Sequence, residues 1–220
     1  MRTDPFTDTW LFLIGQQSDQ LALGYGRWLV VGGFLLLLLG SIAIALREWV
    51  EDPVQRTGRD LTLWALRVLV GAMWFQGMLW KLPFFSTENG LYFWTGEEVS
   101  NAAFQIHRDL VKTVLLPVPN FYVLDLLVFF TELAFAVSLL LGLGVRITAA
   151  IGVAFVAQLW LGLYQHPQEW PFTYVFLGGL MALFSVFGAG RSLGLDAELR
   201  RRFPPGLTYG WAASLVRIAT

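Results

Sequence analysis

The chain has 220 residues, of which 56% are hydrophobic and only 14% are charged, and its net charge is −1 at pH 7. Because soluble domains carry about 25% charged residues, this composition indicates an integral membrane protein. The near-zero net charge provides no basic surface for nucleic acid, and the absence of cysteine excludes disulfides, thiolate metal sites, iron–sulfur ligation and a cysteine nucleophile.

Residues 1–60 are predicted to hold an interfacial segment, one transmembrane helix and a cytoplasmic linker. The apolar run from Trp10 to Ile14 is too short for a signal peptide, and its Trp and Phe side chains suit the membrane interface. The stretch 28–46 contains no charged residue and has the length of about 20 residues that a membrane helix needs.

Residues 61–199 are predicted to form a four-helix membrane domain, which is followed by a cytoplasmic tail at 200–220. The four apolar stretches lie at 61–82, 121–143, 146–165 and 172–187. The short turn "GLGVR" at 142–146 predicts that the second and third of these helices form an antiparallel hairpin. The loop 83–120 is expected to carry one short amphipathic helix around His107, with Thr95 and Glu98 as a capping box upstream.

The distribution of Lys and Arg predicts the orientation of these five spans. Most arginines flank one set of span ends, and cytoplasmic loops carry the excess of basic residues. We therefore expect the N-terminus outside, the C-terminus inside and the loop 83–120 on the outer face of a bacterial or archaeal cytoplasmic membrane.

Polar residues recur at helical spacing inside the predicted spans. Arg67, Gly71, Trp74 and Lys81 share one helix face, because they are separated by 4, 3 and 7 residues and each residue turns the helix by about 100°. The glycine would permit a neighbouring helix to approach closely.

Two carboxylates on the next long helix also share one face and could pair with these cations. Asp125 and Glu132 lie seven residues, or two turns, apart. Lys81 and Asp125 are expected near the outer boundary, and Arg67 is expected within reach of Glu132. An unpaired charge in the bilayer costs at least about 2.5–3.5 kcal/mol, so we expect these charges to pair inside the bundle. The predicted polar seam consists of Arg67, Gln76, Lys81, Asp125, Glu132 and Gln158. The seam is interpreted either as a functional site or as a device that only sets the helix register.

The same residues carry a resemblance to a family. The stretches "LRVLVGAMWFQGMLWKL", "TELAFAVSLLLGLGVRITA" and "GAGRSLGLDAEL" resemble the DoxX/DoxD family of small membrane proteins. Matching positions are Arg67, Gly71, Trp74, Lys81, Glu132, Arg146, Arg191, Gly194 and Asp196. The resemblance implies a four-helix membrane bundle over residues 61–199, to which the span 28–46 and the long loop are additions.

The resemblance also implies a respiratory function. DoxD is the large membrane subunit of thiosulfate:quinone oxidoreductase, which oxidises thiosulfate outside the membrane and passes electrons to quinone. Our leading interpretation is a membrane subunit of such a quinone-linked oxidoreductase, in which Glu132 and Arg67 handle protons or orient the quinone. Two alternatives stay open: a non-catalytic accessory subunit of a larger respiratory complex, and a small transporter that uses the same polar seam.

Candidate ligand contacts follow from residue chemistry. Quinone needs an apolar, aromatic slot with a few polar contacts. Its candidate residues are Trp74, Trp160, Tyr164, Gln165 and Trp170, and an aromatic belt at the membrane interface would explain them equally. A thiosulfate dianion would need the cations Lys81, Arg108 and Lys112, which lipid headgroups would also attract. No haem, flavin, iron–sulfur or metal ligand set is evident in the sequence. The partners expected are membrane lipid, other subunits of a respiratory complex and a small extracytoplasmic subunit.

Overall fold

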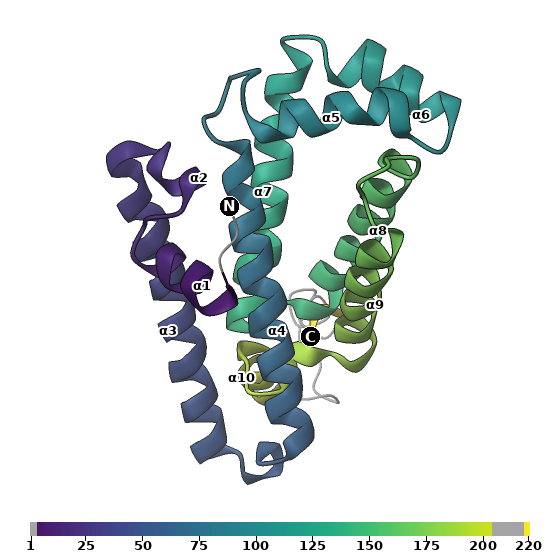
Figure 1. Cartoon of the computed structure of the whole chain (residues 1–220). Coiled ribbons are helices and arrows are strands. Elements are labelled where there is room, and N and C mark those ends of the chain that lie inside the picture. The colour runs from purple at the N-terminus through teal and green to yellow at the C-terminus, as the bar shows by residue number, and fades with distance from the viewer. Residues whose placement is uncertain (1–3, 204–217) are drawn as a thin grey trace.

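The computed structural model describes residues 4–203 and 218–220, and these residues form helices and helical turns without any strand. The predicted all-α class is therefore confirmed (Figure 1). In chain order the helices are α1 (Pro5–Leu13), α2 (Ser18–Leu21), α3 (Arg27–Glu51), α4 (Gly58–Gly77), α5 (Gly90–Asn101), α6 (Gln105–Leu110), α7 (Asn120–Leu141), α8 (Val145–Gly162), α9 (Pro171–Phe187) and α10 (Leu195–Arg202). Of the predicted tail 200–220, residues 204–217 lie outside the described residues.

Four helical stretches are long and apolar enough to cross a membrane. They are Gly24–Glu51, Gly58–Lys81, Asn120–Leu141 and Val145–Gly162, and together they fit a multi-pass membrane bundle. The apolar helix α9 has 17 residues. At 1.5 Å per residue its length is about 26 Å, slightly less than the hydrocarbon thickness of about 30 Å. A fifth span through α9 stays a prediction.

Helices α4 and α7 lie side by side where they overlap, in the middle of the bundle (Figure 1). Gly71 allows this contact, as predicted. A β-carbon at Gly71 would lie 3.0 Å from Cγ of Leu140 and 3.1 Å from Cβ of Leu139. A larger side chain at position 71 would therefore push the two helices apart.

Helix α8 packs mainly along α9, so the predicted hairpin of α7 and α8 is only partly correct. The tight turn is present, with Gly142 and Gly144 both in the left-handed backbone region. Beyond the turn α7 and α8 spread apart, and α8 runs beside α9 instead (Figure 1). The bundle thus consists of an α4–α7 pair and an α8–α9 pair, with α3 on the outside of the first.

Aromatic side chains join the two helix pairs in the core. Trp74 of α4 contacts Phe135 of α7 and Phe155 of α8, with ring centroids 5.1 Å and 5.7 Å apart. Phe135 and Phe155 also contact each other at 5.6 Å. Edge-to-face contacts of this kind add stability beyond the apolar area that they bury.

The segment 83–120 forms a helical cap over one end of the bundle (Figure 1). We define the cap as residues 90–115, which contain α5, α6 and a wider helical turn at Val111–Leu115. Backbone hydrogen bonds from Ala103 N to Leu161 O and from Gln165 N to Asn101 O, both 2.8 Å, attach it to the end of α8. One short helix was predicted here, and the structure instead has two.

The predicted capping box in this segment is wrong. Thr95 and Glu98 lie inside α5, and Asn89 caps that helix by accepting a hydrogen bond from Tyr92 N at 3.0 Å. Asn is a common N-cap residue because its side-chain oxygen satisfies a free backbone N–H. The cap helix therefore begins earlier than the sequence pattern indicated.

Candidate functional site

A buried ion pair joins α4 and α7 within the predicted membrane region. Lys81 ends the helical turn that continues α4, and its Nζ donates to Glu132 Oε2 at 2.7 Å and to Gly77 O at 2.8 Å. The two side chains are only 7% and 6% exposed. Because a buried charge is costly unless it is paired, each group requires the other.

The Lys81–Glu132 pair differs from the pairing that the sequence predicted. Lys81 was expected to meet Asp125, and Glu132 was expected to meet Arg67. Glu132 lies 12 residues, or about 18 Å, after the start of α7 at Asn120, so α7 extends well beyond the end of α4. The prediction assumed that both helices end at the same level, and this offset shifts the partners by two turns.

Asp125 lies two turns from Glu132, towards the cap, and is completely buried. Its two carboxylate oxygens face the Asn89 side chain and the Phe85 backbone N–H without reaching hydrogen-bonding geometry among the described residues. Lys81 is close enough to act on its charge. Among the described residues, Lys81 forms its ion pair with Glu132 and forms none with Asp125.

Trp74 of α4 is an unpaired donor that faces α7, as does Lys81 in the turn after α4. The indole is 4% exposed, and its Nε1–H has no hydrogen-bond partner among the described residues. Buried tryptophan N–H groups usually have a partner. Lys81 and Trp74 thus both face α7, and the Trp74 ring contacts Phe135 and Phe155.

Arg67 lies at the opposite end of the bundle from the cap and is completely buried. Its guanidinium donates to the carbonyl oxygens of Leu139 at 2.7 Å, Ser192 at 3.2 Å and Leu193 at 3.4 Å. A cation beside the last carbonyls of a helix is favoured by the helix dipole. Arg67 therefore holds the end of α7 against the turn before α10. It lies near the opposite end of α4 from the Lys81–Glu132 pair.

Asp196 of α10 caps the start of α8. Its carboxylate accepts hydrogen bonds from Gly144 N at 2.7 Å and Val145 N at 3.1 Å. Burial raises the pKa of Asp196 to about 6, although these two donors and the charges of Arg67 and Arg191 act in the opposite direction. The residues 191–196, which carried part of the family resemblance, thus connect helix ends.

Two other seam residues have partners outside the ion pair. Gln76 is exposed, and its Nε2 donates to Gln17 Oε1 at 3.3 Å, so it does not line a polar interior. Gln158 of α8 donates to Glu98 of the cap at 3.3 Å. The predicted six-residue seam therefore divides into separate contacts at different levels of the bundle.

A carboxylate–histidine contact within the cap was missed by sequence reasoning. Glu98 of α5 lies 2.6 Å from His107 Nε2 of α6 and also accepts from Gln158. Burial raises the pKa of the Glu98 carboxyl, and the hydrogen bond with His107 acts against this rise. Local spacing gave no signal for this contact, because Glu98 and His107 belong to two different helices.

The aromatic residues proposed for quinone do not form one cluster among the described residues. Trp160 contacts Tyr164 at 6.0 Å, and Trp170 contacts Phe172 at 5.3 Å. No ring contact among the described residues links either pair to Trp74. Tyr164 and Trp170 are 52% and 63% exposed, which fits an interfacial aromatic belt.

The proposed anion ligands are also not united by any contact between described residues. Lys81 is buried and neutralised by Glu132. Arg108 donates to Ala102 O at 2.6 Å and to Gln165 Oε1 at 2.7 Å, while Lys112 is exposed. Gln165 thus attaches the cap to the segment after α8, through its side-chain contact with Arg108 and its backbone bond to Asn101.

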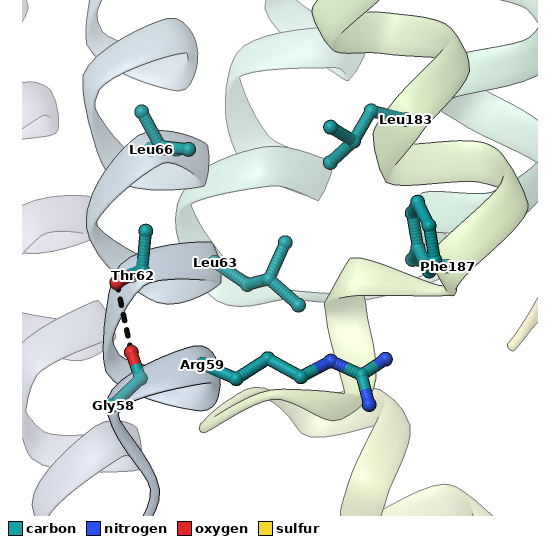
Figure 2. A pocket seen from close by; sticks show the side chains of 7 residues that line it. All are labelled: Gly58, Arg59, Thr62, Leu63, Leu66, Leu183 and Phe187. Carbon is teal, nitrogen blue, oxygen red and sulfur yellow. Dashed lines mark hydrogen bonds between the residues drawn. The ribbon is translucent and has the colours of Figure 1, made fainter.

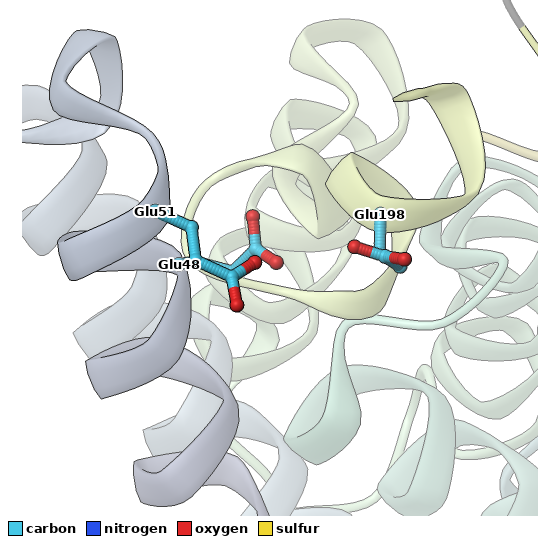
Figure 3. A group of neighbouring side chains, drawn as sticks. All are labelled: Glu48, Glu51 and Glu198. Atoms are coloured by element: carbon cyan, nitrogen blue, oxygen red, sulfur yellow. The ribbon is translucent and has the colours of Figure 1, made fainter. Parts of the chain in front are cut away.

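Three carboxylates gather where α3 meets α10, and their geometry would suit a metal ion (Figure 3). They are Glu48, Glu51 and Glu198. Arg201 forms two 2.6 Å hydrogen bonds to Glu48 and one of 2.8 Å to Glu198. Because Arg47, Arg201 and Arg202 already pair with these three carboxylates, this cluster is an ion-pair network that fastens α10 to α3.

No protein-family model, curated protein or solved structure matches this chain.

Proposed function

We propose that the protein is the membrane subunit of a quinone-linked respiratory oxidoreductase, with quinone bound beside the Lys81–Glu132 pair. The resemblance of residues 61–199 to the DoxX/DoxD family supports this function and implies thiosulfate as the electron donor. In this proposal α4, α7, α8 and α9 form the family's four-helix core, α3 is the additional span, and the cap lies outside the membrane.

The observation that carries the proposal is the free indole N–H of Trp74, which faces α7 as Lys81 does. A quinone headgroup is a flat apolar ring with two carbonyl oxygens, so it requires apolar walls and hydrogen-bond donors. Trp74 Nε1–H and Lys81 Nζ are buried donors, and Phe135 and Phe155 supply aromatic walls. This combination of donors and rings fits quinone better than an anion.

The chemistry assigned to the pair is proton transfer. Reduction of a quinone to a quinol takes up two electrons and two protons, and oxidation of two thiosulfate ions to tetrathionate releases two electrons. In the proposal Lys81 donates a hydrogen bond to a quinone carbonyl, and Glu132 passes on a proton as that oxygen gains negative charge. The electrons come from thiosulfate through a partner subunit.

The test replaces Glu132 with glutamine in the complex purified from its native membrane. Glu132→Gln keeps the shape of the side chain and removes the exchangeable acid. Proton transfer by a positioned group contributes about 10²–10⁴-fold to a rate, so quinone reduction should fall by roughly a hundredfold or more. The measurement is reduction of a soluble quinone analogue with thiosulfate as donor.

Asp125→Asn is the matched control, because Asp125 is buried on the same helix and does not hydrogen-bond Lys81. It should retain most of the rate while testing whether loss of any buried carboxylate impairs the complex. Full activity of Glu132→Gln in an intact complex would end the proton-transfer proposal.

A non-catalytic accessory subunit is the second candidate, and the contacts of Arg67 and Asp196 favour it. Both side chains bind backbone groups at helix ends, which is a purely architectural use of buried charge. An accessory subunit would co-purify with larger redox proteins and bind no quinone alone. Quinone bound by the isolated chain, and lost in Trp74→Phe, would contradict this second candidate.

A further inference from the structure

An open apolar groove lies between the start of α4 and the end of α9 (Figure 2). This end of the bundle is opposite the cap (Figure 1). Its volume is about 360 Å³. Its walls are formed by Gly58, Arg59, Thr62, Leu63, Leu66, Leu183 and Phe187. The Thr62 hydroxyl donates to Gly58 O at 2.8 Å, so its polarity is satisfied within α4 and the groove is apolar apart from Arg59.

Arg59 extends from α4 across the mouth of the groove towards α9 (Figure 2). Its guanidinium lies over the Phe187 ring, 5.9 Å from the centroid. No described residue forms an ion pair with Arg59. The groove therefore has an uncompensated positive charge at one end and hydrocarbon along its length.

A second guanidinium strengthens the positive charge beside Phe187. Arg191 donates to Phe187 O at 3.1 Å. Burial lowers the pKa of Arg191, and so do the nearby charges of Arg200, Arg146 and Arg59, while Asp196 opposes them. Arg191 itself lines the neighbouring hollow with Asp52 and Gln55, so it adds positive charge near this end of α9 without lining the groove.

We propose that this groove is a binding site for one anionic phospholipid, with an acyl chain between Leu66 and Leu183 and the phosphate at Arg59. The apolar stretch Gly58–Lys81 begins at this point, so Arg59 lies where hydrocarbon gives way to headgroups. Charge complementarity selects the anionic headgroup, and the groove selects a lipid over a free phosphate ion. The site is independent of the proposed quinone chemistry.

The test is native mass spectrometry of the full chain in detergent, titrated with phosphatidylglycerol or phosphatidylcholine. The parent protein should bind one phosphatidylglycerol more tightly than phosphatidylcholine. Since a basic residue near a membrane contributes about a fivefold effect in affinity for anionic lipid, Arg59→Gln should weaken phosphatidylglycerol binding roughly fivefold. Its affinity for phosphatidylcholine should not change.

Arg202→Gln is the charge-matched control, because Arg202 is exposed on α10 and is bonded to Glu198 away from the groove. An equal loss of affinity for phosphatidylglycerol in Arg59→Gln and Arg202→Gln would overturn the proposal, because it would indicate only a diffuse electrostatic attraction. Displacement of phosphatidylglycerol by millimolar inorganic phosphate would also overturn it, because the ligand would then be a phosphate ion.

A second pair of variants tests the apolar part of the site. Thr62→Trp fills the groove from its wall and should lower the affinity for both lipids several-fold. Leu61→Trp adds the same ring to an adjacent position that does not line the groove, and should leave both affinities unchanged. Equal lipid affinities in these two variants would show that no acyl chain occupies the groove.

Discussion

Two glycines in the turn between α7 and α8 have similar backbone conformations but different surroundings. Gly142 has φ 69° and ψ 41°, and Gly144 has φ 63° and ψ 26°. A β-carbon at Gly142 would lie 2.7 Å from Cα of Gly194 and still closer to Nη1 of Arg67. A β-carbon at Gly144 would meet nothing within 4 Å. Alanine at the two positions therefore separates backbone strain from steric conflict.

The expected losses of unfolding free energy in Gly142→Ala and Gly144→Ala differ only by the cost of the steric conflict at Gly142. A left-handed conformation costs an L-residue about 1–2 kcal/mol, and both variants incur this cost. Overpacking of a close contact adds about 1–3 kcal/mol, and only Gly142→Ala incurs it because Gly194 is backbone that cannot rotate away. Gly142→Ala should therefore lose about 2–5 kcal/mol, and Gly144→Ala about 1–2 kcal/mol.

The assay is unfolding of the purified protein in detergent micelles by added dodecyl sulfate, followed by tryptophan fluorescence. The difference in unfolding free energy between Gly142→Ala and Gly144→Ala measures the close packing of Arg67 and Gly194 against the turn. Equal losses would refute that packing. A Gly144→Ala protein as stable as the parent would refute the left-handed conformation of the turn.

Two further predictions concern charged groups. Lys81→Met should destabilise the protein by about 3–5 kcal/mol, because it leaves Glu132 unpaired, whereas adding Glu132→Leu should restore most of the loss; a double variant as unstable as the single one in the same unfolding assay would contradict this. Hydrogen bonds from Arg201 and Arg202 lower the pKa of Glu198 from 4.5 to about 2. Its stabilising effect should be complete above pH 4.5 and disappear as the pH falls towards 2, so a Glu198→Gln protein with the parent's pH–stability profile would count against that contact.

The sequence by itself was sufficient to predict the helical class, the four long apolar helices and the close approach of α4 and α7 at Gly71. These features depend on local properties, namely the length of an apolar run and the 3.6-residue period of a helix. The same period placed Trp74 and Lys81 on one face of α4, and the structure shows both side chains buried.

Partner choice was decided by tertiary structure. Lys81 meets Glu132 because α7 begins well beyond the end of α4, and this offset depends on the cap helices, whose bounds the sequence pattern did not predict. Arg67 binds backbone carbonyls, which no residue pattern identifies. Counting residues from the ends of the predicted helices therefore identified the buried charged residues but assigned them the wrong partners.

The contacts that were missed all join residues from different helices. Glu98 meets His107 where α5 turns into α6, and Arg201 of α10 meets Glu48 of α3 across more than 150 positions of the chain. The groove at Arg59 exists only because the end of α9 lies beside the start of α4 (Figure 2). Helix formation is determined locally, whereas such contacts depend on how completed helices pack, and their geometry appears only when the whole bundle is assembled.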